Sequence, residues 1–262
     1  MADAAPPITE TVKSYDYAGL NKLPQITIYF WIMKICATTL GETAGDLLSM
    51  TLNVGYAIST IILLSVFLVT LTAQMVSKRY HPLLYWTVIL TTSTAGTTMS
   101  DFMDRTLGLG YMKGSAILLS CLVAIFAFWR LRIGSLSVNE IRSRKVEFLY
   151  WTAILFSNTL GTALGDFLSD TSGLGFTGGA LLIAGLLTLV LAATYFTEIS
   201  RVALFWIAFV LTRPFGAQMG DILTKPHEKG GLDLGTIGSS LVLASILLIF
   251  IVFTSLNKNK QR

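Results

Sequence analysis

The chain has 262 residues, of which 53% are hydrophobic and only 13% are charged, and its mean hydropathy is +0.67. A soluble domain carries about 25% charged residues, so this composition excludes a soluble monomer of this size. The formal net charge of +4 is small, and its basic residues fall in short segments between apolar runs, which excludes a nucleic-acid-binding protein.

The apolar runs along the chain predict an all-α integral membrane protein. Residues 1–26 are polar and are predicted to form a cytoplasmic tail. A membrane-spanning helix needs about 20 mostly apolar residues. Runs of this kind, almost free of charge, cover residues 58–73, 116–129, 180–196 and 241–253.

One sequence unit occurs four times. In each copy an aspartate follows a tryptophan by fifteen residues, a glycine precedes the aspartate by five residues, and a small residue directly precedes it. The tryptophans are Trp31, Trp86, Trp151 and Trp206; the aspartates are Asp46, Asp101, Asp166 and Asp221; the first glycines are Gly41, Gly96, Gly161 and Gly216. A second apolar span follows each aspartate, so each unit is a helix, a short turn and a helix.

Four such units give eight membrane-spanning helices. Each unit has an even number of spans, so the four copies enter the membrane in the same direction, as parallel repeats around an axis along the membrane normal. Repeats 1 and 2 occupy residues 27–131, and repeats 3 and 4 occupy residues 147–254. A basic cytoplasmic linker, 132–146, separates the two halves, and 255–262 form a C-terminal tail.

The distribution of basic residues predicts the orientation. Segments on the side of the two termini hold 13 lysines and arginines, whereas the opposite turns hold 4, namely Arg105, Lys113, Lys225 and Lys229. Cytoplasmic loops carry the excess of positive charge, so both termini are predicted to be cytoplasmic. The four aspartates then lie toward the outer end of their spans.

Each first helix of a unit carries two neighbouring stripes. At 100° per residue, the positions 7, 11 and 15 residues after the tryptophan share a polar face, which lipid cannot solvate and which we expect inside the bundle. This stripe provides a candidate cation pathway: Asp46, Asp101, Asp166, Asp221, Glu42, Thr97, Thr162 and Asn158. The adjacent stripe is small and allows close helix packing. Its glycines are Gly41, Gly45, Gly96, Gly161, Gly165, Gly216 and Gly220.

The aspartates have two interpretations. The negative charge of an aspartate near a helix C-terminus is unfavourable next to the negative end of the helix dipole and costs about 0.3–1 kcal/mol. The basic residues on that side of the membrane are too few and too irregular to supply one counter-charge per unit. A bound or permeating cation would compensate all four. The surrounding hydroxyl and amide oxygens suit hard ions such as Mn²⁺, Mg²⁺, Ca²⁺, alkali ions or protons. Alternatively, each aspartate locks its turn by accepting hydrogen bonds from backbone N–H groups.

Two repeats depart from the pattern. Only repeat 1 has a carboxylate at position 11, Glu42, and only repeat 4 has a base at position 7, Arg213, which Pro214 follows. If repeats 1 and 4 are neighbours in a closed ring, Arg213 could reach Glu42, either as a neutralising ion pair or as a gating or coupling element. Pro214 removes a backbone hydrogen bond and should kink its helix. The four repeat tryptophans are interpreted as interface anchors or packing wedges.

The units, with their T-x-x-G-x-x-x-G-D-F/L core, resemble a bacterial family of predicted membrane-anchored proteins built from four tandem copies of a repeat of unknown function. The resemblance covers about residues 29–253, and repeat 3 is its most typical copy. It implies an eight-span protein of the bacterial inner membrane and implies no activity.

The first hypothesis for the function is a cation channel or transporter whose pathway follows the axis of the four repeats. The alternative is a non-transporting scaffold or sensor in which the aspartates hold the turns. An enzyme would show a lateral or soluble-side cleft, and the sequence contains no nucleophile–base pair and no phosphate-binding loop, so we expect neither catalysis nor a cofactor.

Overall fold

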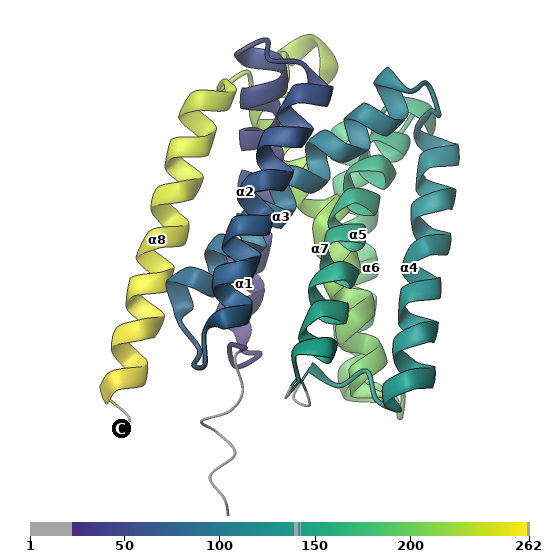
Figure 1. The fold of residues 1–262 in the computed structure, drawn as a ribbon. Helices are drawn as coiled ribbons and strands as arrows, with labels where there is room; N and C mark the ends of the chain where they lie inside the picture. Colours follow the sequence, from purple (N-terminus) through teal and green to yellow (C-terminus); the bar gives the residue numbers. More distant parts are fainter. Residues whose placement is uncertain (1–22, 139–140, 142, 261–262) are drawn as a thin grey trace, which may run out of the picture.

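The computed structural model describes residues 23–138, 141 and 143–260, and within them the chain folds into eight α-helices (Figure 1). In three repeats the first helix continues without a break into a π-helical turn. The α-helices are α1 (Ile28–Asp46), α2 (Tyr56–Val76), α3 (Pro82–Asp101), α4 (Tyr111–Ile133), α5 (Arg144–Asp166), α6 (Gly175–Phe196), α7 (Arg201–Thr224) and α8 (Thr236–Lys260). The π-helical turns are η2 (Leu47–Thr51), η3 (Phe102–Thr106) and η5 (Phe167–Thr171), and η6 (His227–Lys229) is a 3₁₀ turn.

Within the described residues, five helices are long and apolar enough to cross a membrane: α2, α4, α6, α7 and α8. The other three, α1, α3 and α5, have 19 to 23 residues but carry many hydroxyl and charged side chains. Most of these polar side chains are buried inside the protein. The chain is therefore a multi-span membrane protein, in which the polar helices are shielded by apolar ones.

The first helices of the four repeats form a closed inner ring. Helix α1 packs against α3, α3 against α5, α5 against α7, and α7 returns to α1. The second helix of each repeat packs outside this ring, mainly on the first helix of the following repeat. Thus α2 covers α3, α4 covers α5, α6 covers α7, and α8 covers α1. The last helix consequently closes the ring onto the first.

Each turn between the two helices of a repeat ends with two residues of positive φ, separated by one residue, and the longer turn of repeat 4 has a third such residue, Gly230. The second of the pair is always a glycine, since a side chain at this φ would be strained. The first is glycine in two repeats and Asn53 or Asp233 in the others, which fits the tolerance of short polar residues for this conformation. The four glycines are Gly55, Gly110, Gly175 and Gly235.

Three sequence-predicted boundaries need correction. Helix α4 extends to Ile133 and α5 begins at Arg144, so the predicted linker 132–146 is shorter at both ends. The predicted C-terminal tail from 255 continues α8 through Lys260. Pro214, where the sequence predicts a kink, lies inside α7, which is one helix from Arg201 to Thr224. The predicted N-terminal tail lies mostly outside the described residues, as do 139–140, 142 and 261–262.

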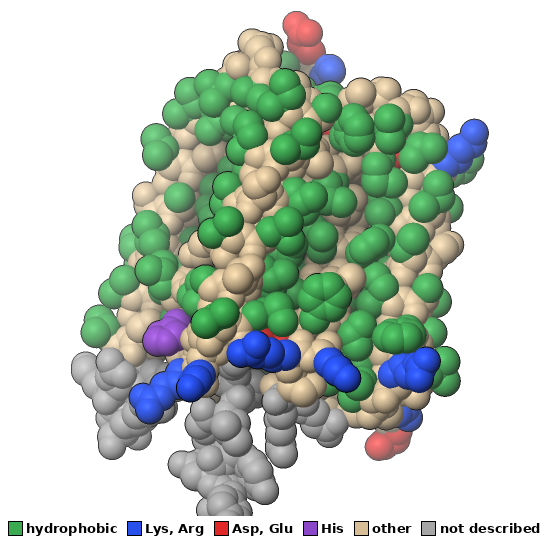
Figure 2. Space-filling view, in the orientation of Figure 1, with side chains coloured by type: hydrophobic (Ala, Val, Ile, Leu, Met, Phe, Trp, Pro, Cys, Tyr) green, Lys and Arg blue, Asp and Glu red, His purple; other side chains and the backbone are tan. Residues whose placement is uncertain are grey.

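The two ends of the described chain lie at the same end of the bundle, which we call the terminus end; the opposite one, with the turns inside each repeat, is the turn end (Figure 1). Figure 2 shows a band of hydrophobic side chains across the middle of one face and a row of lysines and arginines along the terminus end. This arrangement is typical of a membrane-embedded protein whose basic residues lie at a headgroup layer.

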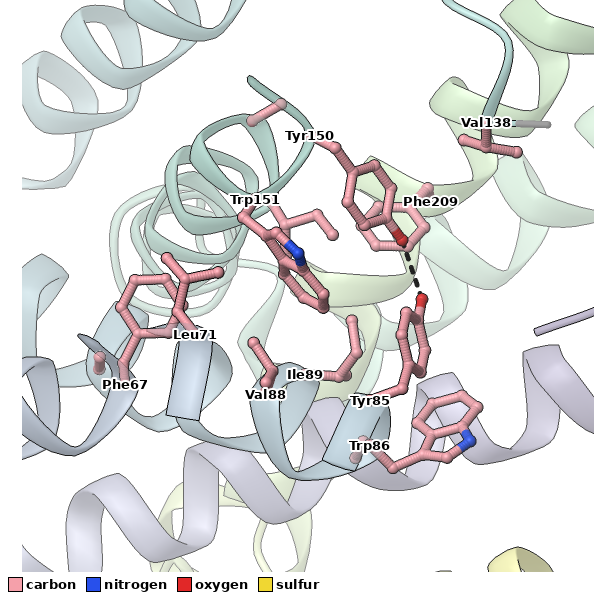
Figure 3. Close-up of a cluster of buried hydrophobic side chains, with 14 of the residues drawn as sticks. Phe67, Leu71, Tyr85, Trp86, Val88, Ile89, Val138, Tyr150, Trp151 and Phe209 are labelled. Carbon is pink, nitrogen blue, oxygen red and sulfur yellow. Dashed lines mark hydrogen bonds between the residues drawn. The ribbon is translucent and has the colours of Figure 1, made fainter. Parts of the chain in front are cut away.

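Three of the four repeat tryptophans pack inside the protein. Trp86, Trp151 and Trp206 are buried, and the last also donates a hydrogen bond to the carbonyl of Leu136. Trp31 is only partly buried, against the ring of Phe205. Of the two interpretations offered by the sequence, the packing wedge describes the three buried indoles. Figure 3 shows Trp86 and Trp151 among buried aromatic side chains.

Candidate functional site

The four repeat aspartates form one buried layer near the turn end, and two basic side chains bridge them in pairs. Arg105 contacts Asp101 through Nε at 2.9 Å and Asp166 through Nη2 at 3.0 Å. Lys225 contacts Asp46 at 2.6 Å and Asp221 at 3.2 Å. Each base therefore joins its own repeat to the next one around the ring: repeat 2 to repeat 3, and repeat 4 to repeat 1.

The sequence predicted too few bases to supply one per repeat, and the structure shows two bases, each of them shared by two aspartates. Arg105 and Lys225 each stand four residues after an aspartate, one helical turn away, and each also reaches the aspartate of the next repeat. Two bases thus serve four carboxylates. The signal in the sequence was this spacing, which occurs in repeats 2 and 4 and is absent from repeats 1 and 3, where Met50 and Asp170 take the position.

The aspartates also lie farther from their helix ends than the sequence suggested. In repeats 1 to 3 a π-helical turn of five residues follows, so the opposing dipole is displaced by more than a turn. Within the described residues, their side-chain partners are Arg105 and Lys225, and not the backbone N–H groups of the turns.

Lys225 lies just beyond the end of α7. Burial acts to lower the pKa of its ammonium group, but the carboxylates of Asp221 and Asp46 outweigh burial and raise that pKa above its usual value. The ammonium group is therefore charged at physiological pH, and it holds repeats 4 and 1 together as a permanent cation.

Arg213 lies one layer deeper and occupies the centre of the ring. Its guanidinium is fully buried, and the Nη2 atom donates to the carboxylate of Glu42 at 2.9 Å. The same nitrogen lies 2.6 Å from the hydroxyl of Thr97 and 2.7 Å from that of Thr162. One side chain thus contacts all three other repeats. We call Arg213, Glu42, Thr97 and Thr162 the central cluster.

The glycine stripe brings the inner helices close enough for this cluster to form. A Cβ atom added to Gly161 would lie 2.2 Å from Cγ of Arg213, and one added to Gly41 would lie 2.2 Å from the hydroxyl oxygen of Ser93. Equivalent contacts join Gly96 to Asn158 and Gly216 to Thr38. In every case the glycine of one repeat faces position 7 of the next. The small stripe of each repeat therefore packs on the polar stripe of its neighbour.

Three carboxylates from two repeats converge beside the central cluster. Oxygen atoms of Glu42, Asp46 and Asp221 lie within 4.8 Å of one another, and all three side chains are buried. We call these residues the acidic triad. Asp101 and Asp166 belong to the same layer but to the other bridged pair. Asn158 is not brought to the aspartates, because its amide donates to the hydroxyl of Thr92 between α5 and α3.

A separate groove of about 710 Å³ opens between the start of α1, α6 and α7. Its lining is largely apolar, with Ile35, Leu191 and Ala208 among the residues, and Arg201 and Tyr195 at its edge. The described lining contains no carboxylate and no histidine, so the groove offers no acid–base pair for catalysis.

Comparison with known proteins identifies the repeat. The family model described as a repeat of unknown function, DUF347, matches four times, at residues 29–80, 84–133, 149–200 and 204–259. These matches cover most of the chain and coincide with the four helix pairs. No curated protein and no solved structure matches the chain.

Proposed function

The chain belongs to the DUF347 repeat family, whose function is unknown, and we propose that it is a carrier of a hard divalent cation. In this proposal all eight helices span the bacterial inner membrane, both termini are cytoplasmic, and the acidic triad is the cation site. The protein has no enzymatic activity and no cofactor.

The observation that carries the proposal is an imbalance of buried charge. The aspartate layer and the central cluster contain five carboxylates but three basic groups, Arg105, Lys225 and Arg213. Charged groups inside a membrane protein require compensation, because lipid provides none. One divalent cation would supply the two missing positive charges.

The acidic triad is the place where that cation fits best. Hard cations take oxygen ligands, and carboxylates from Glu42, Asp46 and Asp221 already lie within 4.8 Å of one another. Among the described residues, the basic groups bonded to the triad are Lys225 and Arg213, so an incoming cation would compete with both of them. Binding would thereby loosen the bridge between repeats 4 and 1.

Arg213 supports a carrier more than an open channel. Its guanidinium occupies the ring axis and bonds to three other repeats, so a cation cannot follow the axis unless this side chain moves. A cation that binds Glu42 removes one of the partners of Arg213 and so favours that movement. Substrate binding and opening of the path are then one event.

A scaffold is the second candidate, because the same ion pairs join neighbouring repeats. In that case the aspartates would contribute to stability alone. The ring offers a matched comparison, since the pairs Asp46–Asp221 and Asp101–Asp166 are both bridged and buried. Among the described residues, a third carboxylate lies within 4.8 Å of the first pair alone.

The test measures Mn²⁺ uptake into proteoliposomes that contain a Mn²⁺-sensitive dye, with Mg²⁺ and Ca²⁺ as competitors. We expect Asp46→Asn/Asp221→Asn to weaken Mn²⁺ uptake by more than about tenfold, as expected for the loss of two ligands. The control Asp101→Asn/Asp166→Asn should lose stability but keep most of the uptake. Absence of uptake in the wild type, or an equal loss in both double variants, would contradict the carrier and leave the scaffold.

A further inference from the structure

Lys34 is a buried base that the proposed cation site does not use. It lies on α1, two helical turns from Glu42 toward the terminus end, and its side chain is fully buried. Among the described residues, its Nζ atom has no hydrogen-bond partner. Its Nζ atom lies over the ring of Phe209, 4.2 Å from the ring centroid. A charged ammonium at such a place in a membrane is costly.

The titratable groups around Lys34 offer no counter-ion. On α7, Arg213 stands one turn beyond Phe209 and repels an ammonium group. On α3, the titratable residue closest to the position equivalent to Lys34 is Tyr85. Helix α8 has no titratable residue from Thr236 to Leu256. On α1 itself, Cys36 donates to the carbonyl of Leu243, and Glu42 is bonded to Arg213.

We propose that Lys34 is a proton-binding site whose occupancy alternates with that of the acidic triad, so that the protein exchanges a divalent cation for protons. This inference rests on the proposed function and adds the coupling ion to it. The bound proton is one of the three N–H bonds of the ammonium group. On release, that bond breaks, its electron pair stays on nitrogen, and a water molecule takes the proton.

Arg213 links the two sites electrostatically. While Glu42 neutralises the guanidinium, the repulsion between Arg213 and a protonated Lys34 is weakened. When a cation takes Glu42, the charge of Arg213 is no longer compensated, and it disfavours the ammonium form of Lys34. Cation binding therefore expels the proton, and protonation of Lys34 expels the cation, because the coupling is reciprocal.

A pair of buried tyrosines lies on the terminus side of Lys34. The buried hydroxyl groups of Tyr85 and Tyr150 are 2.8 Å apart and point toward each other in Figure 3. They line a small cavity of about 10 Å³ together with Phe30 and Phe205. These four residues each directly precede a repeat tryptophan, so the cavity lies where the four inner helices converge. Hydroxyl pairs of this kind can both accept and donate a proton.

The experiment records internal pH and Mn²⁺ together in proteoliposomes under an imposed inward Mn²⁺ gradient, with the membrane potential clamped by K⁺ and valinomycin. In the wild type we expect Mn²⁺ entry to raise the internal pH as protons leave. Lys34→Met should still admit Mn²⁺, with at least about a tenfold loss of the proton signal. The control is Ile89→Met, which introduces methionine at the position of repeat 2 that is equivalent to Lys34. This variant should behave as the wild type.

Lys34→Arg provides a second variant, because a guanidinium keeps its charge at every accessible pH. We expect it to weaken Mn²⁺ binding by about tenfold or more and to move no protons. Proton movement in Lys34→Met equal to that of the wild type, or Mn²⁺ entry without proton movement in the wild type, would overturn the inference and leave the carrier intact. A wild type that admits no Mn²⁺ would overturn both.

Discussion

At the scale of single residues, Arg213 has a structural role and, in the proposed carrier, a functional one. Its methylene groups fill the space that Gly161 leaves open, and its guanidinium satisfies two hydroxyl groups and one carboxylate from three helices. Removing one member of such a buried pair leaves an uncompensated charge and typically costs about 3–5 kcal/mol. The stability of the ring therefore depends on a base at position 7 after the tryptophan in one repeat, Arg213, and an acid at position 11 in another, Glu42.

The glycines that permit this packing give a prediction about stability. Gly161→Ala would place a methyl group 2.2 Å from Cγ of Arg213, so the helices must separate, and we expect a loss of about 1–3 kcal/mol. Gly185→Ala is the control, because Gly185 is helical in α6 and has no atom within 4 Å of the added Cβ.

Thermal unfolding of the two variants in detergent measures this difference. Gly161→Ala should unfold at a clearly lower temperature than the wild type, while Gly185→Ala should match or slightly exceed it because alanine favours helix. Equal midpoints for both variants would show that the close approach of α5 and α7 does not limit stability.

Several residue positions could be predicted from the sequence because they recur. The fixed offsets from each tryptophan identified the polar stripe, the small stripe and the possibility that Arg213 reaches Glu42, which the structure places at 2.9 Å. The bridging roles of Arg105 and Lys225 were missed. These roles depend on the order of the repeats around the ring. The helical periodicity within one repeat carries no information about that order.

At the scale of elements, the second helix of each repeat packs on the next repeat. In repeats 1 to 3 the turn between the helices holds two residues of positive φ after a π-helical extension, and in repeat 4 a longer turn with a 3₁₀ segment takes its place. In each case the second helix lies away from its own first helix. The sequence predicted helix pairs but could not predict this exchange, because apolar faces of similar composition would pack equally well on either partner in lipid.

Closure of the ring by α8 can be tested with a cross-link. The hydroxyl oxygens of Thr43 on α1 and Ser240 on α8 are 2.9 Å apart, so cysteines at these positions should form a disulfide with little rearrangement. We expect Thr43→Cys/Ser240→Cys, in a Cys36→Ala background, to cross-link repeats 1 and 4 under mild oxidation.

The readout is a protease site introduced between α4 and α5. After cleavage, the two halves should migrate together on a non-reducing gel only if the disulfide has formed. Thr43→Cys/Ser245→Cys is the matched control, because Ser245 lies on the exposed side of α8. Efficient cross-linking of the control pair, or none of the first pair, would contradict the closed ring.

At the scale of the whole molecule, four similar repeats form a ring with twofold character. Bases bridge repeat 2 to repeat 3 and repeat 4 to repeat 1, whereas the described structure contains no such bridge between the aspartates of repeats 1 and 2 or of repeats 3 and 4. One bridge therefore joins the repeats on either side of the linker, and the other joins the last repeat to the first. If the carrier moves as two rigid parts, we expect these to be the bridged pairs of repeats and not the two halves of the sequence.

Glu42 makes the two bridged pairs unequal. Within the part of the chain that the structure describes, a third carboxylate joins the pair of repeats 4 and 1 alone, which gives one acidic triad and one two-carboxylate bridge. The central claim is that this difference creates a cation site in a ring that is otherwise held together by ion pairs.

Anomalous X-ray scattering from crystals soaked in Mn²⁺ tests this claim most directly. The account predicts one strong peak bounded by Glu42, Asp46 and Asp221, with Lys225 displaced, and no peak between Asp101 and Asp166. A structure without Mn²⁺ at the triad at concentrations that drive uptake, or with Mn²⁺ only at the other pair, would contradict it.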